Sequence, residues 1–403
     1  MADQSPAFIP LAGIRLGTVA AGIRYRDRSD LVVVELTAGS TCAALFTRNR
    51  FCAAPVVVAR DHLTRHQPRY LLINSGNANA GTGDEGINGA IASCRALAAL
   101  RGCQVDQVLP FSTGVIGETL PVERLVVALP DALSALNENG WLNAARAIMT
   151  TDTVPKLFSR QMEYEGKRFT VTGMAKGSGM IRPDMATMLA YVATDLTVDS
   201  ALLHQCLQQA VAASFNSITV DGDTSTNDAC VLIATGQSGC VPVCDAESEV
   251  YRLLCEAVES LCMDLALAIV RDGEGATKLV SVSVEEALTR EEAREVAYTI
   301  AHSPLVKTAL FASDPNWGRI LAAIGRADVP GLEIDRLELW LGDVCIVSGG
   351  GRAEGYSEAA GQAVMDAEEI LIRVVLGRGK ASATVYTCDL SDEYVRINAE
   401  YRT

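Results

Sequence analysis

The stretch Met185-Ala186-Thr187-Met188 places a threonine where a loop containing Pro183 meets an apolar run. A threonine hydroxyl becomes an acyl-transfer nucleophile when the free α-amine of the same residue serves as its base. The reference pKa of an α-amine, about 7.7–8.0, suits that role near neutral pH. Because Thr187 is internal, this chemistry requires cleavage of the Ala186–Thr187 bond, which the threonine hydroxyl can start by attacking the Ala186 carbonyl. On these residues alone, a buried strand residue is the simpler interpretation.

Two other segments offer groups for the same chemistry. "PFSTGVIG" (110–117) sets Thr113 and Gly114 at a strand end, where a hydroxyl and a backbone N–H can stabilise an oxyanion. Such Ser-Thr-Gly segments are also common turns. "RDGEGATK" (271–278) holds Glu274 between glycines, where its carboxylate could meet a ligand ammonium group. The alternative, a helix end with solvated charges, is favoured for this segment on sequence alone.

A GxGxxG pattern at Gly81, Gly83 and Gly86 follows a predicted strand and precedes a predicted helix. This context is typical of dinucleotide binding. However, Asp84 and Glu85 would repel a pyrophosphate, and the insert after Asn74 is too long for the tight turn. We therefore do not expect a dinucleotide site.

Metal sites are not expected either. "VDGDTSTNDA" (220–229) begins like an EF-hand loop, but Thr226 and Leu232 stand where that loop needs glycine and glutamate. This loop is either a structural cluster of Asx-turns or a hydrogen-bonding loop near a site. His62 and His66 form an HxxxH pair without the acidic neighbour of HExxH.

Composition narrows the function classes. The net charge of −15 disfavours binding to nucleic acid or to anionic membranes. The N-terminus shows no signal peptide and no apolar run is long enough to span a bilayer. The 12 cysteines contain no CxxC pair and lie mostly among apolar residues, as expected for free thiols in a reducing cytoplasm.

Alternating strands and helices must position these groups, in an α+β layered plan. "RFTVTGMAK" reads as a strand that runs into the glycine loop before Thr187, and "MLAYVATD" as a buried strand after it. A helix is expected to end at Gly102, and another is expected to start with Ser200 as its N-cap. The remaining expected strands are 31–36, 42–46, 54–59 and 70–74 and "ACVLIATG", and the remaining helices are 122–136 and 248–270.

With 403 residues, we expect one large domain and a smaller companion. From Leu279 onward the pattern fits a split β-α-β-β-α-β unit. The predicted smaller α/β domain covers 285–385, and the larger covers 1–284 with 386–403.

The segment "KGSGMIRPDMATML" (176–189) resembles the self-cleavage signature of the ornithine acetyltransferase family, also called glutamate N-acetyltransferases, of arginine biosynthesis. Further blocks resemble the same family in the same order, from about residue 12 to 403: "NSGNANAGTG", "STGVIGE", "TTDTVPK", "FNSITVDGDTSTND", "RDGEGATK", "SPLVKTALFASDPNWGRI" and "INAEYRT".

The resemblance implies self-cleavage between Ala186 and Thr187 into chains 1–186 and 187–403 that stay associated, with Thr187 as the nucleophile. Thr113 and Gly114 match the family's oxyanion-hole pair. The implied main-domain fold is an αββα sandwich, and the implied assembly is a heterotetramer of two processed chains, each in two copies. The implied substrate-binding positions are Thr153, Lys176, Thr187, Glu274, Asn398 and Thr403.

The implied reaction is ping-pong acetyl transfer from N-acetylornithine to glutamate through acetyl-Thr187, releasing ornithine and N-acetylglutamate. No cofactor or metal is expected. Weak use of acetyl-CoA as a second acetyl donor is expected. The rivals are an N-terminal-nucleophile amidase or aminopeptidase, which would pass its acyl group to water, and a non-enzymatic amino-acid binder of the same fold.

Overall fold

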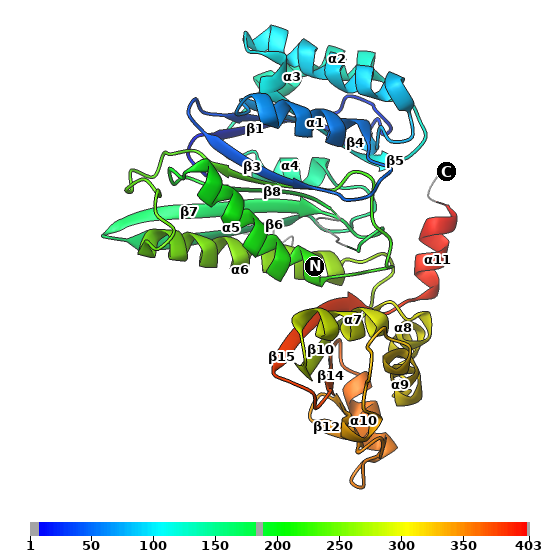
Figure 1. Ribbon diagram of the computed structural model, residues 1–403. Helices are drawn as coiled ribbons and strands as arrows, with labels where there is room; N and C mark the ends of the chain where they lie inside the picture. The colour runs from blue at the N-terminus through cyan, green and yellow to red at the C-terminus, as the bar shows by residue number, and fades with distance from the viewer. Residues whose placement is uncertain (1–7, 183–187, 401–403) are drawn as a thin grey trace. The chain divides into compact units, whose positions relative to one another are not determined.

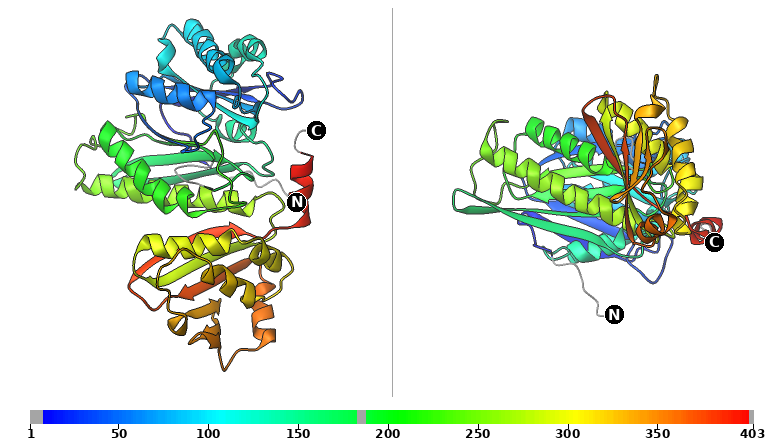
Figure 2. Two further views of the ribbon diagram at one scale, coloured as in Figure 1. Left: turned by 45° about the vertical axis from the view of Figure 1, so that its right-hand side comes forward. Right: turned by 90° about the horizontal axis from the view of Figure 1, so that it is seen from below.

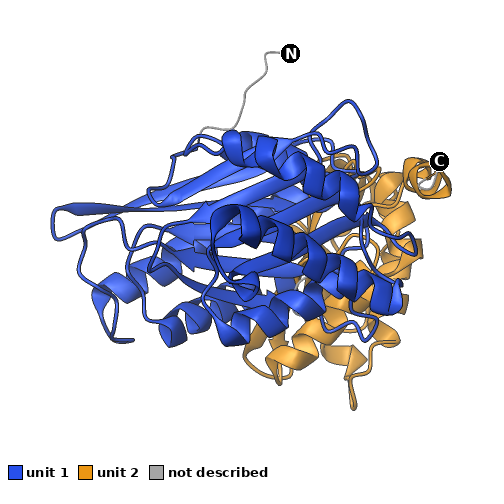
Figure 3. Ribbon diagram, turned by 90° about the horizontal axis from the view of Figure 1, so that it is seen from above, with its two compact units in different colours: residues 1–216, 223–269 blue, residues 217–222, 270–403 orange. Residues whose placement is uncertain are grey.

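The computed structural model describes residues 8–182 and 188–400. The chain divides into two compact units, coloured separately in Figure 3. Unit 1 comprises 1–216 and 223–269, and unit 2 comprises 217–222 and 270–403. The predicted cleavage site Ala186–Thr187 and the predicted ligand contact Thr403 lie outside the described residues.

Unit 1 contains two β-sheets whose inner faces pack together (Figure 1). The first sheet has the order β1 (Ile14–Val19), β2 (Leu31–Leu36), β4 (Tyr70–Asn77) and β5 (Val108–Val115). The second has the order β3 (Thr41–Phe46), β9 (Ala229–Ala234), β8 (Leu189–Thr194), β7 (Lys167–Lys176) and β6 (Lys156–Tyr164).

Helices cover the outer faces of both sheets, and the left panel of Figure 2 shows the same layers of unit 1 from another side. On the first sheet lie α2 (Gly83–Arg101) and α3 (Val122–Ser134), and α1 (Ala54–Arg65) contacts β5 and α2. On the second lie α5 (Ser200–Ala213) and α6 (Glu249–Arg271). The short α4 (Trp141–Ala147) contributes to the core between the sheets. The predicted αββα sandwich is confirmed.

The core between the sheets explains why β8 reads as a continuous apolar run. All six of its residues are buried, with neighbours in its own sheet on both sides and packed layers above and below. The ring of Tyr191 on β8 meets that of Phe111 on β5 edge to face, with centroids 5.3 Å apart. This contact joins the two sheets near the strand ends that carry the predicted site.

Two local predictions are wrong. Residues 54–59 form the first half of α1 and not a strand, since Pro55 opens the helix and Val56, Ala59 and His62 bury one helical face. A short run of β-branched residues does not separate a buried strand from a buried helix. The N-cap of α5 is Asp199 and not Ser200, because the Asp199 carboxylate accepts hydrogen bonds from two backbone N–H groups of the first turn.

The other long helices are confirmed. Helix α2 ends at Arg101, and Gly102 forms the expected left-handed cap with a φ of 64°. Helices α3 and α6 match the predicted spans 122–136 and 248–270 within two residues at each end.

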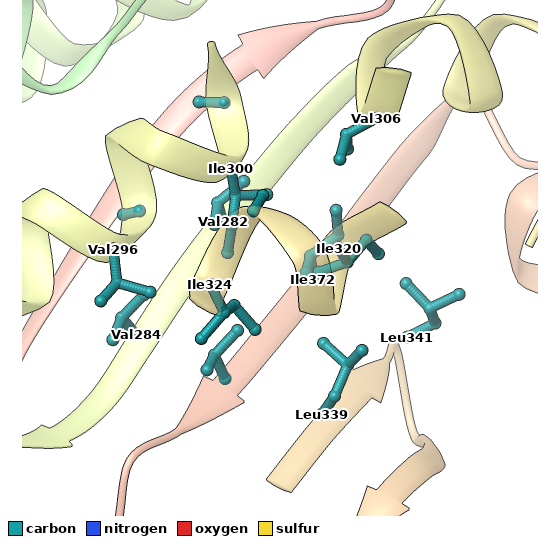
Figure 4. Packing of buried hydrophobic residues seen from close by; sticks show 14 of the residues in the cluster. Val282, Val284, Val296, Ile300, Val306, Ile320, Ile324, Leu339, Leu341 and Ile372 are labelled. Atoms are coloured by element: carbon teal, nitrogen blue, oxygen red, sulfur yellow. The ribbon is translucent and has the colours of Figure 1, made fainter. Parts of the chain in front are cut away.

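Unit 2 is built on one six-stranded sheet. Its order is β13 (Gly351–Arg352), β12 (Val344–Ser348), β11 (Glu338–Leu341), β14 (Glu369–Val375), β10 (Leu279–Ala287) and β15 (Ala381–Cys388). Its helices are α7 (Arg290–Ala301), α8 (Pro304–Phe311), α9 (Trp317–Gly325), α10 (Glu358–Met365) and α11 (Asp392–Ala399). Side chains of α7, α8 and α9 pack on this sheet, as Figure 4 shows for Ile300, Val306 and Ile320.

The predicted split β-α-β arrangement is found in β12, α10 and β14. Both β12 and β14 run antiparallel to β11, which lies between them, so the two strands joined through α10 are parallel to each other but not adjacent. The strands and helices of unit 2 follow one another in the predicted order, including the last strand β15 at one edge, and α8 and α9 are inserted after α7.

The division into units differs from the predicted domain boundaries 285–385 and 386–403. Strand β10 pairs along its length with β14 and β15, from Leu279 opposite Cys388 onward, so both predicted boundaries fall inside paired strands. The segment 217–222 also belongs to unit 2: Thr219 N–H donates to the carbonyl of Tyr386 at 2.9 Å. Nothing in the sequence near 217–222 indicates that pairing.

Candidate active site

A small cavity in unit 1 is lined by two of the predicted residues, Thr113 and Lys176. Its volume is about 30 Å³, which is room for about one or two water molecules. It lies where β5, β7, β8 and β9 begin or end. Its lining includes Thr113, Lys176, Met188, Ser225, Asn227 and Asp228. Met188 is the residue that follows Thr187 in the chain, so the predicted nucleophile is joined directly to a residue of the cavity wall.

The ends of β4 and β5 fix the position of Thr113 and Gly114. These strands are parallel, with Thr113 opposite Ser75 and Gly114 opposite Gly76, and their register shifts there. Gly114 has a φ of 133°, and a Cβ on it would lie 2.2 Å from the carbonyl carbon of Gly76. Only glycine fits this close approach. The predicted Thr113–Gly114 pair therefore lies beside the cavity for a stereochemical reason.

Lys176 ends β7 and is brought to Thr113 by the packing of the two sheets. Its ammonium donates hydrogen bonds to the hydroxyls of Thr150 at 2.8 Å and Thr113 at 3.3 Å. A carboxylate oxygen of Asp152 lies 3.9 Å away. Two residues predicted from separate segments thus form one buried polar cluster.

Asp152 was not predicted, although it lies in the "TTDTVPK" block. Its carboxylate accepts from Lys156 Nζ at 2.7 Å and from the backbone N–H of Gly177 at 2.7 Å. Burial alone would raise the pKa of Asp152, but Lys176, Lys156 and the Gly177 hydrogen bond outweigh it and hold that pKa well below its usual value. The spacing of Asp152 and Lys156, four residues apart, is the sequence signal for this pair. The predicted residue Thr153 is exposed and is not among the cavity-lining residues.

The sequence left two interpretations of the loop before β9 open, a structural hydrogen-bonded loop or a loop near a site, and the structure supports both. The amide of Asn227 donates to the carbonyls of Ala78 and Ser112, so this loop ties β9 to the first sheet. The same loop lines the cavity with Ser225 and Asp228. Burial raises the pKa of Asp228 well above its usual value, against smaller opposing effects of Ser225 and Lys176.

Glu274 and Asn398 meet in unit 2. The Asn398 amide donates to a carboxylate oxygen of Glu274 at 2.7 Å. The adjacent Gly275, with a φ of 69°, packs against the start of α11, where a Cβ would lie 2.5 Å from Ser391 Oγ. Glu274 is only 7% exposed, so the interpretation of this segment as a helix end with solvated charges is wrong. The pair belongs to unit 2, whereas Thr113 and Lys176 belong to unit 1.

The dinucleotide-like and HxxxH motifs rejected from the sequence have structural roles. Gly83, the second glycine of the GxGxxG pattern, is the first residue of α2. His62 Nδ1 hydrogen-bonds the carbonyl of Val108 at 2.8 Å, and His66 Nδ1 lies 3.0 Å from Asp106. Across residues 8–182 and 188–400, no group of three or more His, Cys, Asp or Glu side chains is arranged to hold a metal. Within the same ranges, no helix has the length and apolar character needed to cross a membrane.

Comparison with known proteins identifies the family of this chain. The sequence model of the ArgJ family matches residues 15–403. The "Arginine biosynthesis bifunctional protein ArgJ" of Methylococcus capsulatus is 59% identical over 394 residues, 98% of this chain and 96% of that protein. The protein of the same name from Pseudomonas fluorescens is 55% identical over 398 residues, 99% of this chain and 98% of that protein.

Two solved structures are also similar in sequence. The Bacillus halodurans arginine biosynthesis bifunctional protein is 38% identical, with 51% of this chain and 96% of that chain covered and a TM-score of 0.49. The Mycobacterium tuberculosis ornithine acetyltransferase complexed with ornithine is 36% identical, with coverages of 44% and 94% and a TM-score of 0.39. The family match over nearly the whole sequence and the two full-length relatives lead to one conclusion: the chain belongs to the ArgJ family.

Proposed function

We propose that this protein moves an acetyl group from N2-acetyl-L-ornithine to L-glutamate through an acetyl ester on Thr187, after cutting its own chain before that residue. Membership of the ArgJ family makes it an acyltransferase of arginine biosynthesis. The observation that carries the residue-level proposal is the cavity that Thr113 and Lys176 share with Met188, the residue joined to Thr187.

The cleavage proceeds in two steps. Thr187 Oγ attacks the carbonyl carbon of Ala186, and its proton passes to the departing nitrogen of Thr187, so that an ester replaces the peptide bond. Water then hydrolyses this ester, leaving a carboxyl group on Ala186 and a free hydroxyl and α-amine on Thr187. That amine becomes the base for the transfer reaction.

In the first half of the transfer, the α-amine accepts the proton of Thr187 Oγ as this oxygen attacks the acetyl carbonyl of N-acetylornithine. The amine then gives a proton to the leaving nitrogen, and ornithine departs. In the second half, the amino group of glutamate attacks the acetyl ester, N-acetylglutamate forms, and Thr187 Oγ recovers its proton. Each half passes through a tetrahedral oxyanion.

Thr113 and Gly114 would stabilise that oxyanion. The Thr113 hydroxyl oxygen already accepts a hydrogen bond from Lys176 Nζ, which leaves its own proton to donate. Gly114 would contribute its backbone N–H from the strained end of β5. The ammonium of Lys176 polarises the Thr113 O–H and adds positive charge where negative charge develops.

The amino-acid ends of the substrates need charges of both signs. Lys176 would bind a substrate carboxylate, and the Glu274 carboxylate, held by Asn398, would bind an ammonium group. Thr153 and the chain-terminal Thr403 complete the proposed contacts. An ornithine complex is known for the Mycobacterium tuberculosis relative, and we extend ornithine binding to this chain as part of the proposal.

The order of strands explains how two fragments would stay together. The strands of the second sheet lie side by side in the order β3-β9-β8-β7-β6. Along the chain, β8 and β9 come after the proposed cut, and their neighbours β3 and β7 come before it. The fragments 1–186 and 187–403 would therefore share one continuous sheet. We further propose a heterotetramer with each fragment in two copies, no cofactor, weak use of acetyl-CoA as a donor, and a cytoplasmic location, which suits 12 free cysteines.

The test is a transfer assay with purified protein and N-acetylornithine carrying a ¹³C-labelled acetyl group. With glutamate present, the label should appear in N-acetylglutamate. Label found only in free acetate would overturn the proposal in favour of an amidase, and unreacted donor with tight ornithine binding would favour a non-enzymatic binder. Glutamate analogues without the α-amine should accept no label, which controls for chemical transfer.

A further inference from the structure

A group of cysteines lies in unit 1 where α5 and α6 cover the second sheet. Cys206 is on α5, Cys255 and Cys262 are on α6, and Cys230 is on β9. Electrostatic interactions link Cys206 to Cys255 and Cys262, and Cys262 to Cys230. The side chains of Cys206, Cys230 and Cys262 are completely buried, whereas Cys255 is partly exposed. The proposed acetyl transfer uses none of these thiols.

Helices α5 and α6 are joined at the position of two of these cysteines (Figure 1). The Tyr251 hydroxyl on α6 donates a hydrogen bond to the Leu202 carbonyl on α5 at 3.2 Å. Cys255 and Cys206 each come about one helical turn later, Cys255 after Tyr251 and Cys206 after Leu202. The Cys206 thiol donates a hydrogen bond to the sulfur of Cys255. Contacts at successive turns thus hold the two sulfur atoms next to each other.

The two thiols differ in reactivity. The hydrogen bond from Cys206 lowers the pKa of Cys255, burial opposes this effect, and Tyr251 adds to it. The same hydrogen bond, followed by burial, raises the pKa of Cys206. Burial raises the pKa of Cys262 and of Cys230 as well. Because Cys255 is also the partly exposed thiol of the group, an oxidant from solvent reaches and attacks it first.

We propose that Cys255 and Cys206 are a peroxide-sensitive pair, in which Cys255 is oxidised first and Cys206 then closes a disulfide between α6 and α5. This inference stands apart from the proposed function, because it uses neither the cavity nor Thr187.

The chemistry needs hydrogen peroxide as its oxidant. The Cys255 thiolate attacks one peroxide oxygen, the O–O bond breaks, and a sulfenic acid and hydroxide form. The Cys206 sulfur then attacks the Cys255 sulfur, so that an S–S bond replaces the S–O bond, and water leaves with the Cys206 proton. Counted from two thiols, the pair gives up two electrons and two protons, and the peroxide becomes two molecules of water.

The disulfide would enclose a segment that contributes to the candidate active site. Between Cys206 and Cys255 the chain contains β9 and the loop before it, which lines the cavity with Ser225, Asn227 and Asp228. The new bond closes this segment into a covalent ring, which restricts the conformations open to it when the protein unfolds.

The test is brief treatment of the purified, folded protein with hydrogen peroxide, followed by alkylation of the remaining thiols and peptide mapping. We expect the linked peptides of Cys206 and Cys255 as the first product, with a mass loss of about 2 Da that dithiothreitol reverses. Both cysteines come after the proposed cut, so the map is the same for a cut and an uncut chain.

Three variants separate the roles of the thiols. In Cys206→Ser, the sulfenic acid of Cys255 should persist and be trapped by dimedone. In Cys255→Ser, Cys206 should stay reduced under the same treatment. The matched control is Cys262→Ala, which removes a completely buried thiol from the same helix and should form the disulfide as the native protein does. If a variant does not fold, the peptide map of the native protein still decides the matter.

Several results would overturn the proposal. These are a first disulfide that involves Cys262 or Cys230, oxidation of the exposed Cys244 before Cys255, and Cys255 oxidised beyond the sulfenic acid while Cys206 stays reduced. Acetyl transfer by the reduced protein is measured separately, so loss of that activity overturns the proposed function and leaves this inference intact.

Discussion

Asp152 and Lys156 form a 2.7 Å ion pair in which both side chains are almost completely removed from solvent. Lys156 is the first residue of β6. The Asp152 carboxylate also lies 3.9 Å from the ammonium group of Lys176. The buried carboxylate of Asp152 thus interacts with both Lys156 and Lys176 and stabilises the polar cluster beside the cavity.

Asp152→Asn should lower the free energy of unfolding by about 3–5 kcal/mol, because it leaves two buried ammonium groups without their carboxylate. Urea denaturation measures the change. The control is Asp61→Asn, which breaks an Asp–Arg pair of the same spacing and distance whose side chains are 51% and 57% exposed. That control should change stability by at most about 0.5 kcal/mol, and equal losses in the two variants would contradict the role given to Asp152.

The same carboxylate predicts a direction for pH dependence. The folded-state pKa of Asp152 lies below its unfolded value, so its contribution to stability is present above the unfolded pKa of about 3.9 and is lost as pH falls below it. Native protein should therefore lose stability between about pH 5 and 2 more steeply than Asp152→Asn does. Parallel acid-unfolding curves for the two proteins would count against this.

Thr113→Ala should reduce kcat for acetyl transfer by about 100- to 1,000-fold, the usual effect of removing one oxyanion-hole donor. Thr113→Ser keeps the hydroxyl and should retain most of the activity. Steady-state kinetics with N-acetylornithine and glutamate separate the two variants. A loss that appears only in KM would assign Thr113 to substrate binding and not to the oxyanion.

Gly114→Ala should destabilise unit 1 by more than about 3 kcal/mol, because the new Cβ would meet the backbone of Gly76 and Asn77 at a φ that disfavours side chains. Gly102→Ala is the control: its φ is also positive, but a Cβ there meets nothing within 4 Å. It should lose only about 1 kcal/mol. Thermal unfolding of the two variants measures the difference, and similar losses would show that close packing at Gly114 is unimportant.

Thr187→Ala should remain one chain, whereas Thr187→Ser should cut slowly because its hydroxyl is retained. Intact-mass analysis of native protein should give two species that correspond to 1–186 and 187–403. An uncut native protein, or a cut Thr187→Ala variant, would remove Thr187 from the mechanism.

Much of this fold could be predicted because its signals are local. The long helices, the glycine cap at Gly102 and the apolar run of β8 follow from periodicity and composition. The helix α1 was mistaken for a strand because a short apolar run carries too few periods to distinguish the two. The boundary near 217–222 could not be predicted, since it depends on pairing with Tyr386 far along the chain.

The site divides in the same way. Thr113, Gly114 and Lys176 lie in recognisable segments and were predicted, and the structure brings Thr113 and Lys176 together. Asp152 and Asp228 were missed because their importance comes from burial beside Lys176, which only the packing of two sheets creates. An aspartate in a polar loop gives no sequence signal of its own burial.

The second sheet combines strands from both proposed fragments, which has a consequence for how the cleaved enzyme unfolds and refolds. Once the backbone is cut between β7 and β8, the sheet can no longer be rebuilt by a single chain. Refolding after heat or denaturant becomes an encounter between two separate polypeptides, in which the adjacent strands β8 and β9 of 187–403 must insert between β3 and β7 of 1–186. The mature protein should therefore behave as a structure assembled once, whose lifetime is set by the rate at which it unfolds.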